Sequence, residues 1–153
     1  MIITYKKLQE HATPPQYAHD GDSGLDLKAC LPPDEMIIIT PNSSALISTG
    51  LALEIPYGFE GQVRSRSGNA AKRQVFVLNS PGTIDSVYKG EIKVILYNLG
   101  QADFVINHGD KIAQLVITPV LYVNLKEGDL TESTRGQDGF GSTDTSQLEL
   151  FSQ

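Results

Sequence analysis

Short apolar runs separated by turn residues recur along the first 125 residues of the chain. Runs of roughly four to eight residues that are rich in Ile, Val and Leu and bounded by Pro, Gly or Asn are typical of β-strands. We predict ten such strands, at Ile2–Lys6, Met36–Thr40, Ala45–Thr49, Leu51–Ile55, Gly61–Ser65, Val75–Leu78, Ile92–Tyr97, Asp103–Ile106, Lys111–Thr118 and Leu121–Leu125. Short strands at this spacing indicate an all-β domain built as a sandwich, jelly roll or barrel.

Two features depart from a simple alternating strand pattern. The segment Gly68–Gln74 favours a short helix, with Ser67 as its N-cap. The runs Met36–Ile39 and Val75–Leu78 are apolar on both faces, which is hard to bury within one small domain. Contacts between subunits would explain these two runs.

The composition changes after residue 125, where Glu, Asp, Ser, Thr and Gly become frequent. Such a composition cannot bury enough apolar surface to fold by itself. We therefore predict a β core over residues 1–125 and a flexible C-terminal arm over residues 126–153. Within the arm, Arg135–Thr143 (RGQDGFGST) combines a cation, an aromatic ring, hydroxyls and glycines, a set that suits a phosphorylated aromatic ligand.

The length and overall charge narrow the function classes. A chain of 153 residues suits one compact domain with a short extension. The net charge of −6 argues against direct nucleic-acid binding, which needs a basic face. No apolar run approaches the roughly 20 residues of a membrane span, and the first residues do not resemble an export signal. We therefore expect a cytoplasmic protein without a membrane partner.

The single cysteine and the three histidines give little sign of chemistry. One cysteine excludes an internal disulfide and any multi-cysteine metal site, which fits a reducing compartment. We interpret Cys30 as an apolar packing residue, because no histidine lies near it in the sequence. His11, His19 and His108 lack the spacing of metal ligands, so we expect each on the surface or in a loop.

Basic residues gather in one segment of this acidic chain, at Arg64, Arg66, Lys72 and Arg73. A run of charges is commonly a solvated surface, and this interpretation stays open. The small residues Ser65, Ser67 and Gly68 between the cations make the segment better suited to a polyanionic ligand.

Five segments, in chain order, resemble the five motifs of the trimeric dUTPase family. They are Ser23–Ala29 (SGLDLKA), Arg66–Ala70 (RSGNA), Gly82–Glu91 (GTIDSVYKGE), Gly109–Val116 (GDKIAQLV) and Arg135–Thr143 (RGQDGFGST). The resemblance implies a β jelly roll that assembles as a homotrimer. It also implies three sites at subunit boundaries, each closed by a C-terminal arm.

The implied activity is hydrolysis of dUTP to dUMP and pyrophosphate, which limits uracil in DNA and supplies dUMP for thymidylate synthesis. Taken alone, Asp85 fits an ordinary turn, because Asp-Ser after Pro-Gly is common turn chemistry. The resemblance instead makes Asp85 the carboxylate that orients and deprotonates water for attack on the α-phosphorus. Phosphoryl transfer needs such a positioned base.

Residues around Asp85 match the positions that select the nucleoside. The resemblance places the Tyr88 ring under the deoxyribose, where it excludes a 2′-hydroxyl, although a packed strand aromatic would look the same. Asn79 matches the amide that hydrogen-bonds uracil. Thr83 and Ile84 match positions that contact the nucleoside through their backbone, and Lys93 matches a further ligand contact.

Other matched positions serve the phosphates. The resemblance assigns phosphate contacts to Arg66, Ser67 and Gly68 at the expected helix start and to Gln114. In the arm, Phe140 would stack on uracil, while Arg135, Ser142 and Thr143 would hold the terminal phosphate. Gly141 is a further substrate-binding position. Mg²⁺ is implied, held mainly by phosphates and water, with Asp26 near it through water.

Several features leave alternatives open. Asn69, Val87, Lys111, Asp138 and Asp144 stand where the family commonly has other residues. The terminal Gln147–Phe151 (QLELF) resembles a peptide that binds the bacterial sliding clamp, or it packs the chain end onto its own trimer. The rival functions are a related dCTP deaminase, which expects a catalytic Glu in place of the Asp85 segment, and a regulatory protein that binds dUTP.

Overall fold

The computed structural model describes residues 1–134, 136 and 137. The chain divides into two units, Met1–Leu121 and Tyr122–Gln153. The predicted boundary lay at residue 125. No helix or strand occurs in the described residues after Pro119. The interpretation of residues 126–153 as a flexible arm stays a prediction.

The first unit consists of strands and one short helix. In chain order the elements are β1 (Thr4–Lys7), β2 (Leu25–Lys28), β3 (Met36–Ile39), β4 (Ser43–Ser48), β5 (Leu51–Glu54), β6 (Phe59–Arg64), α1 (Ser67–Arg73), β7 (Val75–Val77), β8 (Gly82–Ile84), β9 (Lys93–Asn98), β10 (Phe104–Asn107) and β11 (Lys111–Pro119). The all-β, jelly-roll-like prediction is confirmed. No helix in the described part of the chain is long and apolar enough to cross a membrane.

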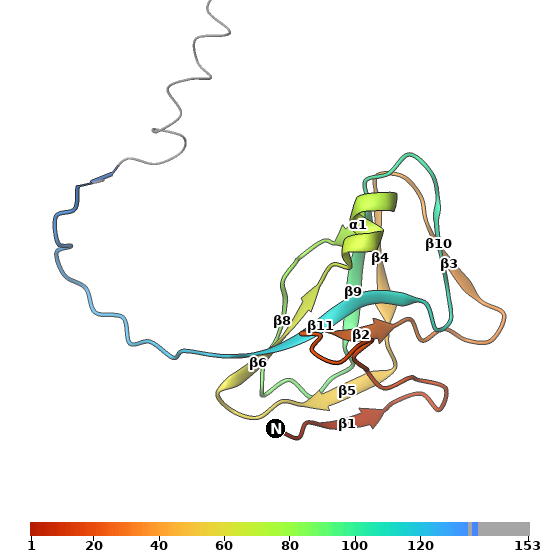
Figure 1. Cartoon of the computed structure of the whole chain (residues 1–153), viewed down its shortest axis with the longest axis horizontal. Coiled ribbons are helices and arrows are strands. Elements are labelled where there is room, and N and C mark those ends of the chain that lie inside the picture. Colours follow the sequence, from red (N-terminus) through yellow and green to blue (C-terminus); the bar gives the residue numbers. More distant parts are fainter. Residues whose placement is uncertain (135, 138–153) are drawn as a thin grey trace, which may run out of the picture. The chain divides into compact units, whose positions relative to one another are not determined.

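The strands pair antiparallel in four small sheets, most of them joining segments far apart in the sequence (Figure 1). One sheet has the order β2-β11-β6-β8 and another the order β4-β9-β7. The pairs β1-β5 and β3-β10 complete the set. The long strand β11 lies between β2 and β6, so it brings the first motif segment beside the strand that leads into α1.

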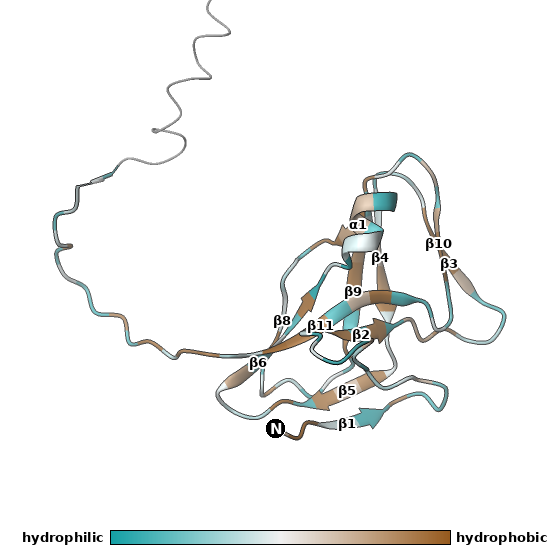
Figure 2. Cartoon of the chain, in the orientation of Figure 1, coloured by the Kyte–Doolittle hydropathy of each residue, from teal (hydrophilic) through white to brown (hydrophobic). Residues whose placement is uncertain are grey.

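Alternation along β9 shows how the core fixes the outward residues. Val94 and Leu96 point into the core and are 1% exposed, whereas Lys93 at the start of the strand is exposed. A one-residue slip would reverse these faces, so core packing holds the register. Figure 2 shows the same division between strands, with β1 hydrophilic and its partner β5 largely hydrophobic.

The sequence did not predict the strands β2 and β8, and the strand that it predicted at Leu121–Leu125 is wrong. β2 and β8 are short, and the polar residues Asp26 and Thr83 interrupt their apolar character. Only pairing with β11 and β6 makes them strands. In contrast, Leu121–Leu125 has no partner strand within the described chain, and its side chains are exposed.

The helix begins differently from the prediction. The N-cap is Arg66, with φ −81° and ψ 126°, and no side chain caps the helix by a hydrogen bond. Ser67 is the first helical residue, so its predicted capping role is wrong. Gln74 ends the helix in the left-handed conformation, with φ 56°, and its N–H returns to the last turn.

Candidate active site

Asp85 follows the last residue of β8 and lines a hollow on the surface of the first unit. Ile84 before it is buried and pairs with Gly61 of β6, so the chain is anchored up to the residue preceding Asp85. The N–H of Tyr88 donates to the Asp85 carbonyl at 3.0 Å and closes a turn. The hollow has a volume of about 550 Å³ and is lined by Leu46, Thr83, Ile84, Asp85, Tyr88, Glu91, Ile92 and Lys93.

The Asp85 side chain is exposed at the surface of the first unit. Among the described residues it makes no ion pair and no side-chain hydrogen bond. A carboxylate in this state keeps its lone pairs available for a water molecule or a ligand.

Tyr88 is held beside Asp85 by its own hydroxyl and by a glycine. The hydroxyl donates to the Glu91 carbonyl at 2.8 Å. A Cβ atom on Gly90 would lie 2.5 Å from the Tyr88 hydroxyl oxygen, so the bare glycine permits this ring position. The residue is 46% exposed and lines the hollow, where a ligand could contact it.

Lys93 brings a cation to the same hollow, supported by Glu91. The Lys93 ammonium lies 3.4 Å from Glu91 Oε2. Glu91 Oε1 accepts a hydrogen bond of 2.9 Å from the N–H of Gly50, so the glutamate ties the hollow to the turn between β4 and β5. Sequence reasoning assigned no role to Glu91, because its partner Gly50 is remote in the sequence.

Asn79 occupies a smaller, adjoining hollow of about 60 Å³. Its Nδ2 would lie 3.1 Å from a Cβ on Gly82, so the amide packs directly over that glycine. This hollow shares Thr83, Ile84 and Lys93 with the larger one. The structure therefore brings together all the residues predicted to select the nucleoside within Asn79–Lys93.

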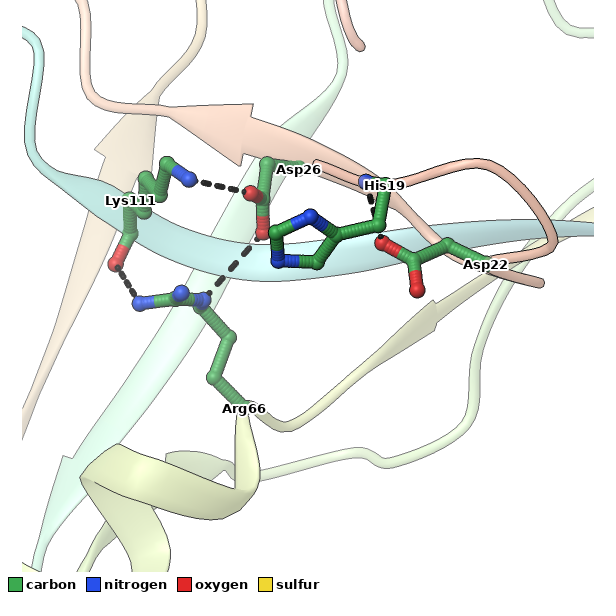
Figure 3. A network of polar contacts seen from close by, with 5 residues as sticks. All are labelled: His19, Asp22, Asp26, Arg66 and Lys111. Atoms are coloured by element: carbon green, nitrogen blue, oxygen red, sulfur yellow. Dashed lines mark hydrogen bonds and ion pairs between the residues drawn. The ribbon is translucent and has the colours of Figure 1, made fainter. Parts of the chain in front are cut away.

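A second cluster surrounds Asp26 on β2 (Figure 3). Lys111 Nζ of β11 lies 2.7 Å from Asp26 Oδ2, and Arg66 Nε lies 3.3 Å from Asp26 Oδ1. Arg66 also donates to the Lys111 carbonyl at 3.4 Å. The Asp26 side chain is only 5% exposed, and its Oδ1 has the ion pair but no hydrogen bond. Sequence reasoning missed the pairing with Lys111.

The other predicted phosphate-binding residues lie near this cluster along the strands. Gln114 stands opposite Asp26 in the β2 pairing and opposite Arg64 in the β6 pairing. Gly24 lets Gln114 approach, because a Cβ there would lie 3.1 Å from Gln114 Cβ. Ser67 and Gly68 are exposed on the first turn of α1.

Asp26 does not fit a direct ligand of Mg²⁺. Both of its oxygens face cations, and Oδ1 is shielded from solvent. Mg²⁺ prefers an octahedral shell of oxygen ligands and several waters, for which this buried carboxylate leaves no open position. The predicted contact through water stays a prediction.

Arg66 and Asp85 open onto different hollows. The hollow beside Arg66 has a volume of about 370 Å³ and includes Asn69, Asp110 and Lys111. Its lining shares no residue with the hollow of Asp85. The predicted arm residues lie outside the described part of the chain, as does Gln147–Phe151; they are Arg135, Phe140, Gly141, Ser142 and Thr143.

A family profile, sequence relatives and solved structures all match the same protein family. The sequence profile of the dUTPase family matches residues 10–144. A deoxyuridine 5'-triphosphate nucleotidohydrolase of Hydrogenobaculum is 52% identical over 144 residues, covering 94% of this chain and 98% of that protein. The corresponding protein of Clostridium tetani is 52% identical, covering 92% of this chain and 95% of that protein.

Solved structures agree. The dUTPase of Staphylococcus bacteriophage 80alpha with dUpNHpp has a TM-score of 0.77 at 30% identity, covering 92% of this chain and 97% of that one. A dUTPase from phage phi11 of S. aureus, described with a structural Mg(II) ion, has a TM-score of 0.76 at 28% identity. This match covers 87% of this chain and 100% of that one.

Proposed function

The chain belongs to the dUTPase family, and we propose that it hydrolyses dUTP to dUMP and pyrophosphate at the hollow of Asp85. One observation supports locating the reaction at this hollow. An exposed carboxylate without a partner among the described residues stands beside a fixed tyrosine and a lysine, at the end of a strand anchored in the core. The dCTP deaminase alternative is not favoured, because the relatives are nucleotidohydrolases and the Asp85 segment is intact.

The proposed reaction uses Asp85 as a general base. Its carboxylate accepts a proton from water as the water oxygen forms a bond to the α-phosphorus. The bond between the α-phosphorus and the bridging oxygen breaks, and pyrophosphate leaves with the electron pair of that bond. The turn closed by Tyr88 and the buried Ile84 restrict the position of the base, as phosphoryl transfer requires.

The nucleoside would lie against the segment Asn79–Lys93. The amide of Asn79 offers two donors and an acceptor, which suits the mixed edge of uracil. The Tyr88 ring would lie under the deoxyribose, because its bond to Glu91 and its contact with Gly90 keep it at the border of the hollow. A 2′-hydroxyl would collide with a ring held in that position.

The triphosphate would be bound by a cationic surface around Arg66. Arg66 and Lys111 together carry two positive charges against the one negative charge of Asp26. The buried carboxylate orients both side chains and leaves net positive charge for an anion. Ser67, Gly68 and Gln114 would add donors to the phosphate oxygens.

The active site would be shared between copies of the chain in a homotrimer. Two observations support this: Asp85 and Arg66 open onto separate hollows, and large apolar side chains remain exposed around them. Leu46 lines the hollow of Asp85 and is 56% exposed. A neighbouring copy would cover these residues and place its Arg66 region or its arm opposite Asp85.

Mg²⁺ would enter with the substrate. A triphosphate supplies oxygen ligands of its own, so the ion needs no protein cage. When bound there it would neutralise phosphate charge. The role of Asp26 would then be to orient the side chains of Arg66 and Lys111 through its two ion pairs.

The proposed function is tested by measuring pyrophosphate release from dUTP, dCTP, dTTP and UTP in the presence of Mg²⁺. We expect rapid release from dUTP and little from the other three. Ammonia release from dCTP would instead indicate a deaminase. Binding of dUTP without pyrophosphate release would indicate a regulatory protein.

Sharing of the site is tested by mixing two inactive variants. Asp85→Asn and Arg66→Ala each remove one half of the proposed site. If the halves come from different copies, random assembly from an equal mixture restores roughly a quarter of the wild-type sites. Recovery after co-refolding supports the shared site, and a mixture that stays inactive contradicts it.

A further inference from the structure

Three potential metal ligands meet at a place distinct from the hollow of Asp85. His11 follows β1, Cys30 follows β2, and His108 lies in the turn between β10 and β11. One ligand atom from each residue lies within 4.8 Å of the others. The two imidazole rings are 5.1 Å apart between centroids, at an angle of 68°. From the sequence we expected each histidine on the surface or in a loop and Cys30 as an apolar packing residue; the fold brings His11, Cys30 and His108 together.

We propose that His11, Cys30 and His108 bind a borderline-soft divalent transition-metal ion such as Zn²⁺. One thiolate and two imidazoles are the donor set that Zn²⁺ and Co²⁺ prefer. Mg²⁺ prefers oxygen ligands, so it would not compete for this site. Three protein ligands and one water would complete a tetrahedral shell.

The geometry permits the required approach. In a tetrahedral zinc site the ligand atoms lie about 3.5 Å apart, given Zn–N and Zn–S bonds of about 2.0–2.3 Å. The three residues would therefore close by roughly 1 Å, measured against the 4.8 Å in the structure. His11 and His108 are both exposed, so little packing opposes this movement; for His108 it would loosen the hydrogen bond from Leu31.

Cys30 is the fixed member of the cluster. It is buried with Ala12 and Leu51, and its N–H donates to the Ser48 carbonyl at 2.8 Å. Gly50 lies against the sulfur, because a Cβ there would be 2.7 Å from Sγ. Neighbouring Ala12 is only 1% exposed, so the chain beside His11 is anchored close to the thiol.

Metal binding would change two features of the cluster, a hydrogen bond to His108 and the proton on Cys30. The N–H of Leu31 donates to His108 Nδ1 at 3.2 Å, so an ion on that nitrogen would replace one hydrogen bond. Burial raises the pKa of the Cys30 thiol, and the Glu91 carboxylate raises it further, whereas Lys7 lowers it. The ion would thus displace a proton, as zinc does at other cysteines. The raised pKa also argues against a nucleophilic role.

The proposed ion would act as a structural cross-link. It would join the segment after β1, the end of β2 and the turn before β11. Through Gly50, which lies beside the sulfur and donates to Glu91, it would also stiffen the support of Lys93. We therefore expect the ion to raise the melting temperature of the full chain without being required for turnover.

The test is a titration of the metal-free full-length protein with Co²⁺. We expect one tightly bound equivalent, with visible bands of a tetrahedral site and a near-ultraviolet thiolate-to-cobalt band. Zn²⁺ should displace the Co²⁺ and raise the melting temperature. Cys30→Ser should lose the thiolate band. His11→Asn, at an exposed position, should weaken binding at least about tenfold. His19→Asn, at the remaining histidine, is the matched control and should behave as wild type.

Absence of a thiolate band in the wild type would overturn the proposal. So would a band that persists in Cys30→Ser, or wild-type affinity in His11→Asn. If Cys30→Ser does not fold, the folded His11→Asn variant decides the question by itself. Pyrophosphate release from dUTP is measured separately, so failure of this site is distinguishable from failure of the proposed function.

Discussion

Asp26 and Asp85 occupy similar places in the sequence and opposite environments in the structure. Each closely follows an aliphatic residue in a short strand of the same sheet. Asp26 is 4% exposed and lies between Arg66 and Lys111. Asp85 is exposed and has no side-chain partner among the described residues. A carboxylate that pairs with two cations holds their side chains in position. A carboxylate without such a partner can accept a proton or bind a water molecule.

The two aspartates differ in exposure because one lies within a paired strand and the other lies just beyond the end of one. Asp26 lies within β2, where β11 pairs with it on one side and Gln16 bridges it on the other. Asp85 comes one residue after β8 ends, where pairing with β6 stops. The backbone therefore encloses one carboxylate and releases the other into the hollow.

Removal of the Asp85 charge should give the largest effect. In Asp85→Asn the side chain keeps its shape and loses its capacity to accept a proton from water. We expect kcat for dUTP to fall about 10²- to 10⁴-fold. The melting temperature should be unchanged, because the side chain is exposed and makes no ion pair or hydrogen bond with the described residues. A variant with near-normal kcat would make Asp85 an ordinary turn residue.

Asp26→Ala should show the opposite behaviour, with a clear loss of stability. It leaves Arg66 and Lys111 beside each other without the carboxylate between them. Breaking a fully buried pair costs about 3–5 kcal/mol. The two cationic side chains are 30% and 42% exposed, so we expect a smaller decrease in the free energy of unfolding, about 1–3 kcal/mol. Denaturant unfolding measures it, and an unchanged midpoint would refute the anchoring role.

Gly90→Ala should give the smallest effect, confined to selectivity. The new methyl group would displace the Tyr88 hydroxyl from the Glu91 carbonyl. We expect the ratio of kcat/KM for dUTP over UTP to fall about five- to tenfold, because the ring no longer excludes a 2′-hydroxyl firmly. Gly128→Ala is the control, since its Cβ would meet no atom within 4 Å. Equal selectivity in both variants would remove Tyr88 from sugar recognition.

The sequence predicted the strand-rich fold and the neighbourhood of Asp85 well. Residues Asn79–Lys93 are close along the chain, so few remote contacts are needed to bring them together, chiefly the pairing of β8 with β6 and the hydrogen bond from Gly50 to Glu91. The apolar run Ile92–Tyr97 likewise predicted the strand that the structure forms at Lys93–Asn98.

Contacts between remote segments could not be predicted. Nothing in the spacing of Asp26 and Lys111 indicates an ion pair, because it depends on β11 lying beside β2. The same holds for Glu91 with Gly50. The strand predicted at Leu121–Leu125 failed for the converse reason: its residues favour a strand, but the described chain offers no partner.

The most direct test of the central claim is the affinity of the Asp85→Asn variant for dUpNHpp, measured by calorimetry beside the wild type. If Asp85 acts on the attacking water, its loss affects the reaction step and leaves binding intact. We predict dissociation constants within about threefold of each other, alongside the loss of turnover. An affinity that falls as far as kcat would contradict the account, because Asp85 would then hold the substrate instead of activating water.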